Sequence, residues 1–140
     1  MAVTAGFTLP AQAGVNARLA GYLGSAVLAS TVSFAVGTLT LIAYVSIWTG
    51  FGPGWAAARS APWWVWFGGC LGAFFVAAVT FLAPRLGATA MVALVVAGQM
   101  SASLALDHFG VLGYQANPVS LSRILGVLFI LIGVYLVQNR

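Results

Sequence analysis

Polar side chains follow one another at helical spacing in the segment 98–110, GQMSASLALDHFG. Gln99, Ser103 and Asp107 are spaced four residues apart, so on a helix they form one polar stripe. Asp107 is the only acidic residue of the chain, and His108 beside it is the only histidine. The surrounding residues are apolar, and unpaired polar groups are costly in hydrocarbon. The stripe must therefore face protein or water, which makes this segment the first candidate for a functional site.

A second polar pair lies near the N-terminus. Gln12 and Asn16 are also four residues apart, and Gln12 lies two residues after Pro10. Pro10 lacks a backbone donor and predicts a helix kink. Two interpretations stay open for the amides: they hydrogen-bond between membrane helices, or they line the site of a broken helix.

Catalytic chemistry is not expected from these residues. One carboxylate and one imidazole are too few ligands for a metal site, and no nucleophile, base and orienting group occur together. We therefore expect no enzyme activity, no catalytic residues, no bound metal and no cofactor.

The composition shows which elements must position the polar residues. Of 140 residues, 62% are apolar and 4% are charged, against roughly 25% charged in a soluble domain. Such a chain cannot cover a surface that faces water, so its solvent is a lipid bilayer. A spanning helix needs about 20 apolar residues. The sequence predicts an all-α integral membrane protein, one domain over 1–140, with five spans at 2–22, 26–48, 62–83, 87–106 and 120–138.

Small residues at helical spacing predict where helices pack closely. Ser33 and Gly37 share one face of the second predicted helix, and Gly68 and Gly72 form a GxxxG pair in the third. We expect Pro84, Arg85 and Leu86 to end the third helix, through a helix breaker and a charge that can reach the headgroups.

The net charge of +4 comes from five arginines and one aspartate. The arginines lie singly near predicted helix ends, where they can reach lipid headgroups, so nucleic acid is not an expected partner. With five spans, one side of the membrane carries Arg18, Arg85 and Arg140. The other side carries Arg59, Arg123 and the N-terminal amine. Because short-loop Lys/Arg bias sets orientation, this balance predicts insertion in both orientations, and two such copies would form an inverted pair.

Several motifs resemble those of the YdcZ-type family, a small branch of the drug/metabolite transporter superfamily. They occur in order along the chain: Pro10-Ala-Gln12 to Asn16-Ala-Arg-Leu19, Gly24-Ser25, Ser33 to Gly37-Thr-Leu, Trp64-Val-Trp66 to Gly72-Ala73, Pro84-Arg-Leu-Gly87, Gly98-Gln99 and Asp107-His108-Phe109-Gly110. The family positions carried by this chain are Pro10, Gln12, Asn16, Gln99, Asp107, His108 and Gly110.

The resemblance implies a multi-pass protein of the bacterial inner membrane, equivalent to one half of a ten-helix transporter. It implies an exporter that works as paired halves, either an antiparallel homodimer or a heterodimer with a paralogous half. Relatives carry a longer apolar segment before the Pro-x-Gln motif than the nine residues found here. The span of the first helix is therefore open.

Three functions follow as alternatives, and the first is a secondary transporter that moves a small solute by alternating access. Its cavity would be lined by Gln12, Asn16, Gln99 and Ser103. Asp107 has two possible roles in it: a loop anchor paired with His108 or with an arginine of the partner, or a proton or cation carrier.

The second alternative is an ion channel, because Gly68 to Phe75 is similar to the glycine-rich stretch of dual-topology fluoride channels. Val76 stands here where those channels carry an arginine. The third alternative is an accessory or structural subunit that moves no solute and only packs against a partner.

Overall fold

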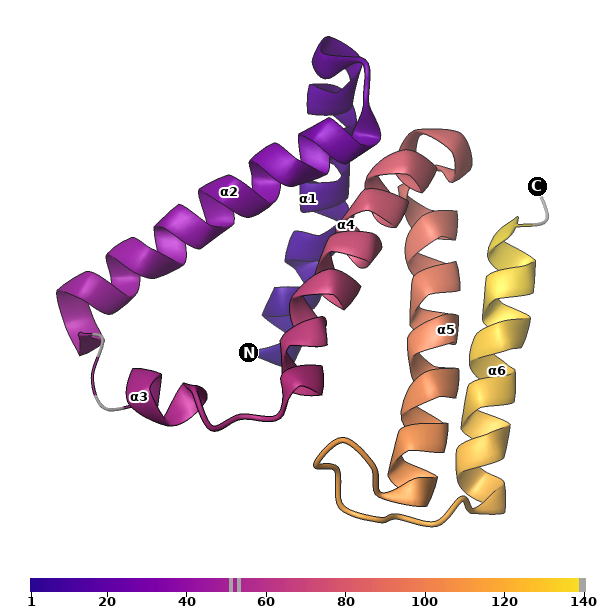
Figure 1. Cartoon of the computed structure of the whole chain (residues 1–140). Helices are drawn as coiled ribbons and strands as arrows, with labels where there is room; N and C mark the ends of the chain where they lie inside the picture. Colours follow the sequence, from indigo (N-terminus) through magenta and orange to yellow (C-terminus); the bar gives the residue numbers. More distant parts are fainter. Residues whose placement is uncertain (51, 53, 139–140) are drawn as a thin grey trace. The chain divides into compact units, whose positions relative to one another are not determined.

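The structure, a computed structural model, describes residues 1–50, 52 and 54–138. It divides into two compact units, Met1–Arg85 and Leu86–Arg140, and each unit is described by itself. Arg140, one of the arginines in the predicted charge balance, lies outside the described residues. In chain order the helical segments are α1 (Ala2–Leu23), α2 (Ala26–Tyr44), the π-helical turn Val45–Thr49, α3 (Gly54–Ala58), the 3₁₀ turn Trp63–Trp66, α4 (Phe67–Leu86), α5 (Ala88–Phe109) and α6 (Leu121–Gln138) (Figure 1).

Five long helices coincide with the five predicted segments to within a few residues. Four of the helical stretches are long and apolar enough to cross a membrane: Ala26–Thr49, Trp63–Leu86, Ala88–Phe109 and Leu121–Gln138. The remaining long helix, α1, is 22 residues long but contains three polar or charged residues. Gln12 and Arg18 are exposed, and Asn16 is buried. The all-helical prediction is confirmed, and a fifth span through α1 stays a prediction.

In the first unit, α1 and α2 meet at a tight turn and pack against each other (Figure 1). Gly24 ends α1 in the left-handed conformation, with φ of 69° and ψ of 8°. A residue with a Cβ is disfavoured there, which is why glycine punctuates this point. Ser25 then caps α2, because its Oγ accepts a hydrogen bond from the N–H of Leu28 at 3.3 Å. The predicted break between the helices at 23–25 therefore has a local cause.

Contacts between α2 and α4 complete the first unit. The hydroxyl of Ser30 donates to the Ala26 carbonyl oxygen at 2.8 Å and lies 3.4 Å from the hydroxyl of Thr80. Both side chains are buried. One turn of α2 further on, the ring of Phe34 lies beside Gly72. Hydroxyls that bond their own helix or a neighbouring helix are satisfied without water, as the interior of a membrane protein requires.

Helix α4 ends at Leu86, within the Pro84, Arg85 and Leu86 segment expected to end it, and it runs three residues past the predicted bound at 83. A proline so near the end removes only one backbone hydrogen bond, to the carbonyl of Thr80, and the last turn survives that loss. The next residue, Gly87, has φ of 77° and ψ of 158°, a conformation that no α-helix contains.

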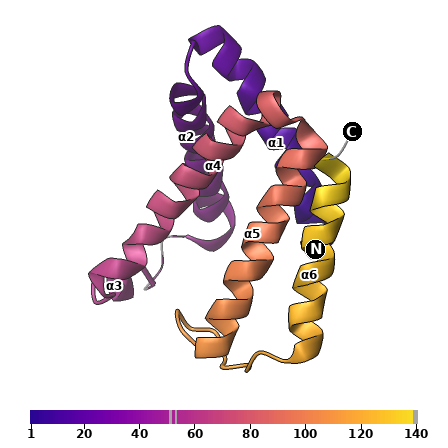
Figure 2. The same ribbon diagram turned by 90° about the vertical axis from the view of Figure 1, so that its right-hand side faces the viewer.

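The second unit is a helical hairpin. Helices α5 and α6 pack side by side and run in opposite directions, joined by the loop after Gly110, and both views show this arrangement (Figures 1 and 2). The N–H of Gly110 donates to the Leu106 carbonyl and closes the last turn of α5. The hairpin places the C-terminal end of α5, with Asp107 and His108, next to the first turn of α6.

Candidate functional site

The only carboxylate of the chain is paired within its own hairpin. The Nη2 of Arg123, in the first turn of α6, donates to Oδ2 of Asp107, in the last turn of α5. The two side chains are about equally accessible, with 30% of Arg123 and 28% of Asp107 exposed. The antiparallel packing of α5 and α6 brings together residues that are 16 positions apart in sequence.

The same two residues hold the backbone of the loop. The main-chain oxygen of Asp107 accepts a hydrogen bond from the N–H of Asn117 at 2.7 Å. The carbonyl of Asn117 accepts one from Nη1 of Arg123 at 2.9 Å. Arg123 therefore binds a side chain at the end of α5 and the main chain of the loop that follows it.

His108 takes part in this loop through a different contact. Its Nδ1 accepts a hydrogen bond from the N–H of Val119 at 3.2 Å, and its ring packs edge-on against Phe109. The Asp107 carboxylate bonds Arg123 and not the neighbouring imidazole. Accepting at Nδ1 leaves the proton of a neutral imidazole on Nε2.

Gly110 is required by space as well as by conformation. Its φ is 59°, and a Cβ built there would lie 2.9 Å from Cβ of Ala116. Both observations exclude a larger residue without rearrangement of the loop. The loop 110–120 is thus held by the close contact at Gly110 and by the hydrogen bonds of Asn117 and Val119.

Chemically, this end of the hairpin is an electrostatically neutral anchor. The aspartate and the arginine cancel each other's charge, and each also organises backbone. The sequence left two roles open for Asp107, and the geometry fits the loop anchor, with the arginine supplied by the same chain. The role of the Asp107 and His108 pair in transport stays a prediction.

One turn from the ion pair along α5, a recess of about 260 Å³ lies between α5 and α6. Ser103 and Arg123 are its polar lining residues, and Met100, Leu104 and Val127 are among the apolar ones. Gln99 does not line this recess and is exposed on α5. Gln99, Ser103 and Asp107 therefore do lie on one helix, as predicted, but in different surroundings. Gln99 is exposed, Ser103 lines the recess and Asp107 pairs with Arg123.

The polar pair of α1 is split between the exterior and the interior. Gln12 is exposed, whereas Asn16 is buried with 3% of its surface accessible. The Nδ2 of Asn16 has no hydrogen-bond partner among the described residues. Pro10 lies inside α1, which continues across it, and the predicted kink stays a prediction. A buried amide without a partner is the kind of group that a ligand or a partner chain satisfies.

The predicted cavity combines α1 of the first unit with α5 of the second, and a shared cleft between them stays a prediction. The predicted packing residues behave unequally within the first unit. A Cβ on Gly72 would contact the Phe34 ring at 3.5 Å, and Ser33 is half-buried. Nothing lies within 4 Å of a Cβ on Gly37 or Gly68, so these two leave open surface on their helices.

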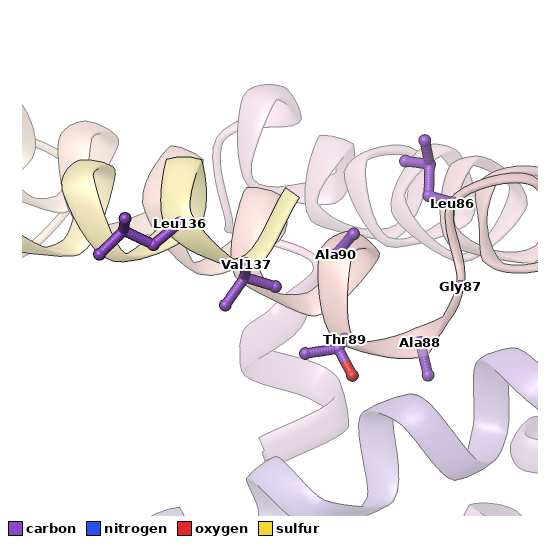
Figure 3. A pocket seen from close by; sticks show the side chains of 7 residues that line it. All are labelled: Leu86, Gly87, Ala88, Thr89, Ala90, Leu136 and Val137. Atoms are coloured by element: carbon purple, nitrogen blue, oxygen red, sulfur yellow. The ribbon is translucent and has the colours of Figure 1, made fainter. Parts of the chain in front are cut away.

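The largest recess that we describe, about 450 Å³, lies at the opposite end of the hairpin (Figure 3). The start of α5 and the end of α6 line it, and Thr89 supplies the only side-chain hydroxyl (Figure 3). None of the predicted cavity residues lines it. Apart from the Thr89 hydroxyl, the polar atoms of its lining belong to the main chain.

Reasoning from the sequence missed Arg123 as the partner of Asp107. The signal was present, since Arg123 is the first arginine after the only acid and lies at the start of the next predicted helix. Two consecutive antiparallel helices bring the end of the first next to the start of the second. The backbone roles of Asn117 and Gly110 carried no comparable signal.

Comparison with known proteins identifies the family of the chain. The sequence profile of the family described as "Putative inner membrane exporter, YdcZ" matches residues 1–136. The chain is 26% identical over 138 residues to "Inner membrane protein YdcZ" of Escherichia coli (strain K12), covering 99% of this chain and 92% of that protein. No solved structure is significantly similar to the chain. A profile match over nearly the whole length, on a helical chain with four helices long and apolar enough to cross a membrane, establishes that this protein belongs to the YdcZ family of inner-membrane exporters.

Proposed function

We propose that this chain is one half of a solute exporter, and that two oppositely inserted halves form the complete carrier. The pair would be two copies of this chain or this chain with a paralogous half. The halves would expose a central cavity to each side of the membrane in turn. Gln12, Asn16, Gln99 and Ser103 would line the cavity.

The exposed amide of Gln99 is the observation that carries this proposal. Gln99 stands at the middle of α5, directly after an apolar run of that helix. An amide at that depth is costly when it faces acyl chains, so it requires water or another protein surface. Gln12 on α1 is exposed in the same way. A second half would supply both the partner surface and a wet cleft.

The charge distribution supports opposite insertion of the halves. The arginines and the N-terminal amine divide evenly between the two sides of a five-span chain. Arg123 is neutralised by Asp107 in the folded hairpin, but orientation responds to Lys and Arg much more than to acidic residues. Neither orientation is therefore favoured strongly.

Cross-linking distinguishes an antiparallel pair from a parallel one. Cys70 is the only cysteine, so Cys70→Ser provides a background for single cysteines. Gln99→Cys should cross-link to its copy through a short reagent, because mid-helix positions lie at the same depth in an inverted pair. Thr89→Cys should not, because each copy places it about 15 Å from the middle on opposite sides. Cross-linking at Thr89 but not at Gln99 would rule out the inverted arrangement.

Solute binding tests the carrier itself. Purified protein should gain thermal stability in the presence of a transported solute, because a ligand that binds only the folded state raises stability. Counterflow of that solute in liposomes should then be saturable. Rapid ion efflux without saturation would favour the channel, and neither binding nor flux would favour an accessory subunit.

A further inference from the structure

The imidazole of His108 holds the end of the loop 110–120 that leads into α6. Its Nδ1 accepts the hydrogen bond from the N–H of Val119, which lies 11 positions later in the sequence. Two residues before Val119, the main chain of Asn117 is bound on both sides, by the carbonyl of Asp107 and by Nη1 of Arg123. The contact of His108 is therefore one of three hydrogen bonds that fix this segment.

The contact of His108 requires a neutral ring. A ring nitrogen accepts a hydrogen bond through its lone pair, and an imidazolium has none because both of its nitrogens carry protons. A protonated His108 would direct its Nδ1–H at the N–H of Val119, so that two donors would face each other. Uptake of a proton therefore breaks the hydrogen bond between the ring and Val119.

The groups around His108 leave this contact to the imidazole alone. Among the described residues of this unit, the other ionisable side chains are Asp107 on α5, Tyr114 in the loop, and Arg123 and Tyr135 on α6. The carboxylate of Asp107 binds Arg123, and the one hydrogen bond found for the imidazole within this described part of the chain is that from Val119. Imidazole is the side chain that ordinarily changes its charge between pH 5 and 8, and the chain has one histidine.

We propose that His108 makes the loop 110–120 sensitive to pH. The neutral imidazole holds Val119 in the closed loop, and protonation releases Val119 to give an open loop. The closed loop binds one proton fewer than the open loop, so high pH favours the closed loop and a fall in pH weakens it. The contacts involved lie within one hairpin, so this response operates whether or not the protein moves solutes.

Spin-label mobility in the reconstituted full-length protein tests this response. In a Cys70→Ser background, Gln115→Cys carries the label on an exposed position of the loop. We expect the ratio of mobile to immobile label to rise about fivefold from pH 8 to pH 5, because a hydrogen bond contributes about 1 kcal/mol net. A label on Ser60→Cys, in the loop before α4, is the matched control and should not respond.

Variants of His108 assign the response to the imidazole. His108→Asn places an amide oxygen near the position of Nδ1 and does not ionise, so its label should stay immobile at both pH values. His108→Phe removes the acceptor, so its label should be mobile at both.

NMR of protein labelled with ¹⁵N-histidine and purified without a histidine tag tests the ring directly, and it needs no substitution of His108. At pH 8 we expect one imidazole with a proton on Nε2 and none on Nδ1. Three results would each overturn the proposal: equal mobility of the wild-type loop at both pH values, a pH response that persists in His108→Asn, or a proton on Nδ1 at pH 8.

Discussion

At the scale of single residues, Asp107 is defined by what it binds. Its carboxylate pairs with Arg123, and its main-chain carbonyl accepts a hydrogen bond from the N–H of Asn117 in the loop. The pair is partly exposed, so its contribution to stability is modest although it organises the loop.

We expect Asp107→Asn to destabilise the protein by about 1 kcal/mol, because the ion pair is lost while the backbone contacts remain. The double variant Asp107→Arg with Arg123→Asp should recover part of that loss, whereas either single reversal should cost more. Thermal unfolding in detergent measures these differences, with Arg59→Gln as the control. If Asp107→Asn abolishes transport while assembly and stability survive, Asp107 is a coupling group and not an anchor.

Gly110 gives a sharper prediction at the same scale. Gly110→Ala should cost roughly 1–2 kcal/mol for the left-handed conformation alone. The contact with Ala116 adds to that cost, because a Cβ would lie only 2.9 Å from its Cβ. Gly126→Ala is the matched control, because Gly126 is helical and a Cβ there meets nothing within 4 Å. Equal stability of the two variants would show that the loop does not have the described conformation.

At the scale of elements, α1 differs from the other long helices. It is not among the four helices that are long and apolar enough to span by composition, and it buries Asn16 while exposing Gln12. The sequence predicts these polar residues and their shared spacing. It does not predict which amide is buried, because i and i+4 positions share a face but not a depth in the packing.

Asn16→Leu separates the two interpretations of the α1 amides. A buried amide whose Nδ2 has no partner adds little stability, and an apolar residue of similar volume should be neutral or slightly stabilising. If Asn16 lines the transport cavity, the variant should unfold no earlier than wild type but lose solute-induced stabilisation. Gln12→Leu is the companion variant on the exposed side. A strongly destabilised Asn16→Leu protein would instead mean that the amide is bonded to a partner chain or an interior water.

Helix ends show a similar division between sequence and structure. Gly24 and Ser25 carry a strong local signal, and the α1–α2 turn lies where the sequence predicts it. Pro84, Arg85 and Leu86 also mark a helix end, but α4 reaches Leu86 and passes the predicted bound at 83, because one lost hydrogen bond near a helix end does not stop the helix. A local signal therefore locates a helix end without fixing its last residue.

At the scale of the whole molecule, the distribution of arginines governs insertion. With five spans, the loop that contains Arg59 lies on the same side as the N-terminus, opposite the C-terminus. The chain has so few charges that one more should shift the balance.

We expect a fluorescent C-terminal reporter that folds only in the cytoplasm to be active in about half of the wild-type molecules if neither orientation is favoured. Ser60→Lys places a second positive charge beside Arg59 and should hold that loop in the cytoplasm. The C-terminus then lies outside, and reporter activity should fall. Ser60→Asn should leave the activity unchanged. A reporter confined to one side in the wild-type protein would contradict dual insertion.

The sequence by itself determined that this protein lies in a lipid bilayer, where its long helices run and which of their positions are polar. These follow from the apolar content, from period-3.6 spacing and from the cost of polar groups in lipid, all of which act locally along the chain. Only the tertiary structure decided that Asp107 pairs with Arg123, that Ala116 closes over Gly110, and that the imidazole of His108 binds the main chain at Val119. Each of these contacts joins residues from different parts of the fold. The distance between such residues is set by how the helices and loops pack, and the spacing of residues within one helix does not determine it.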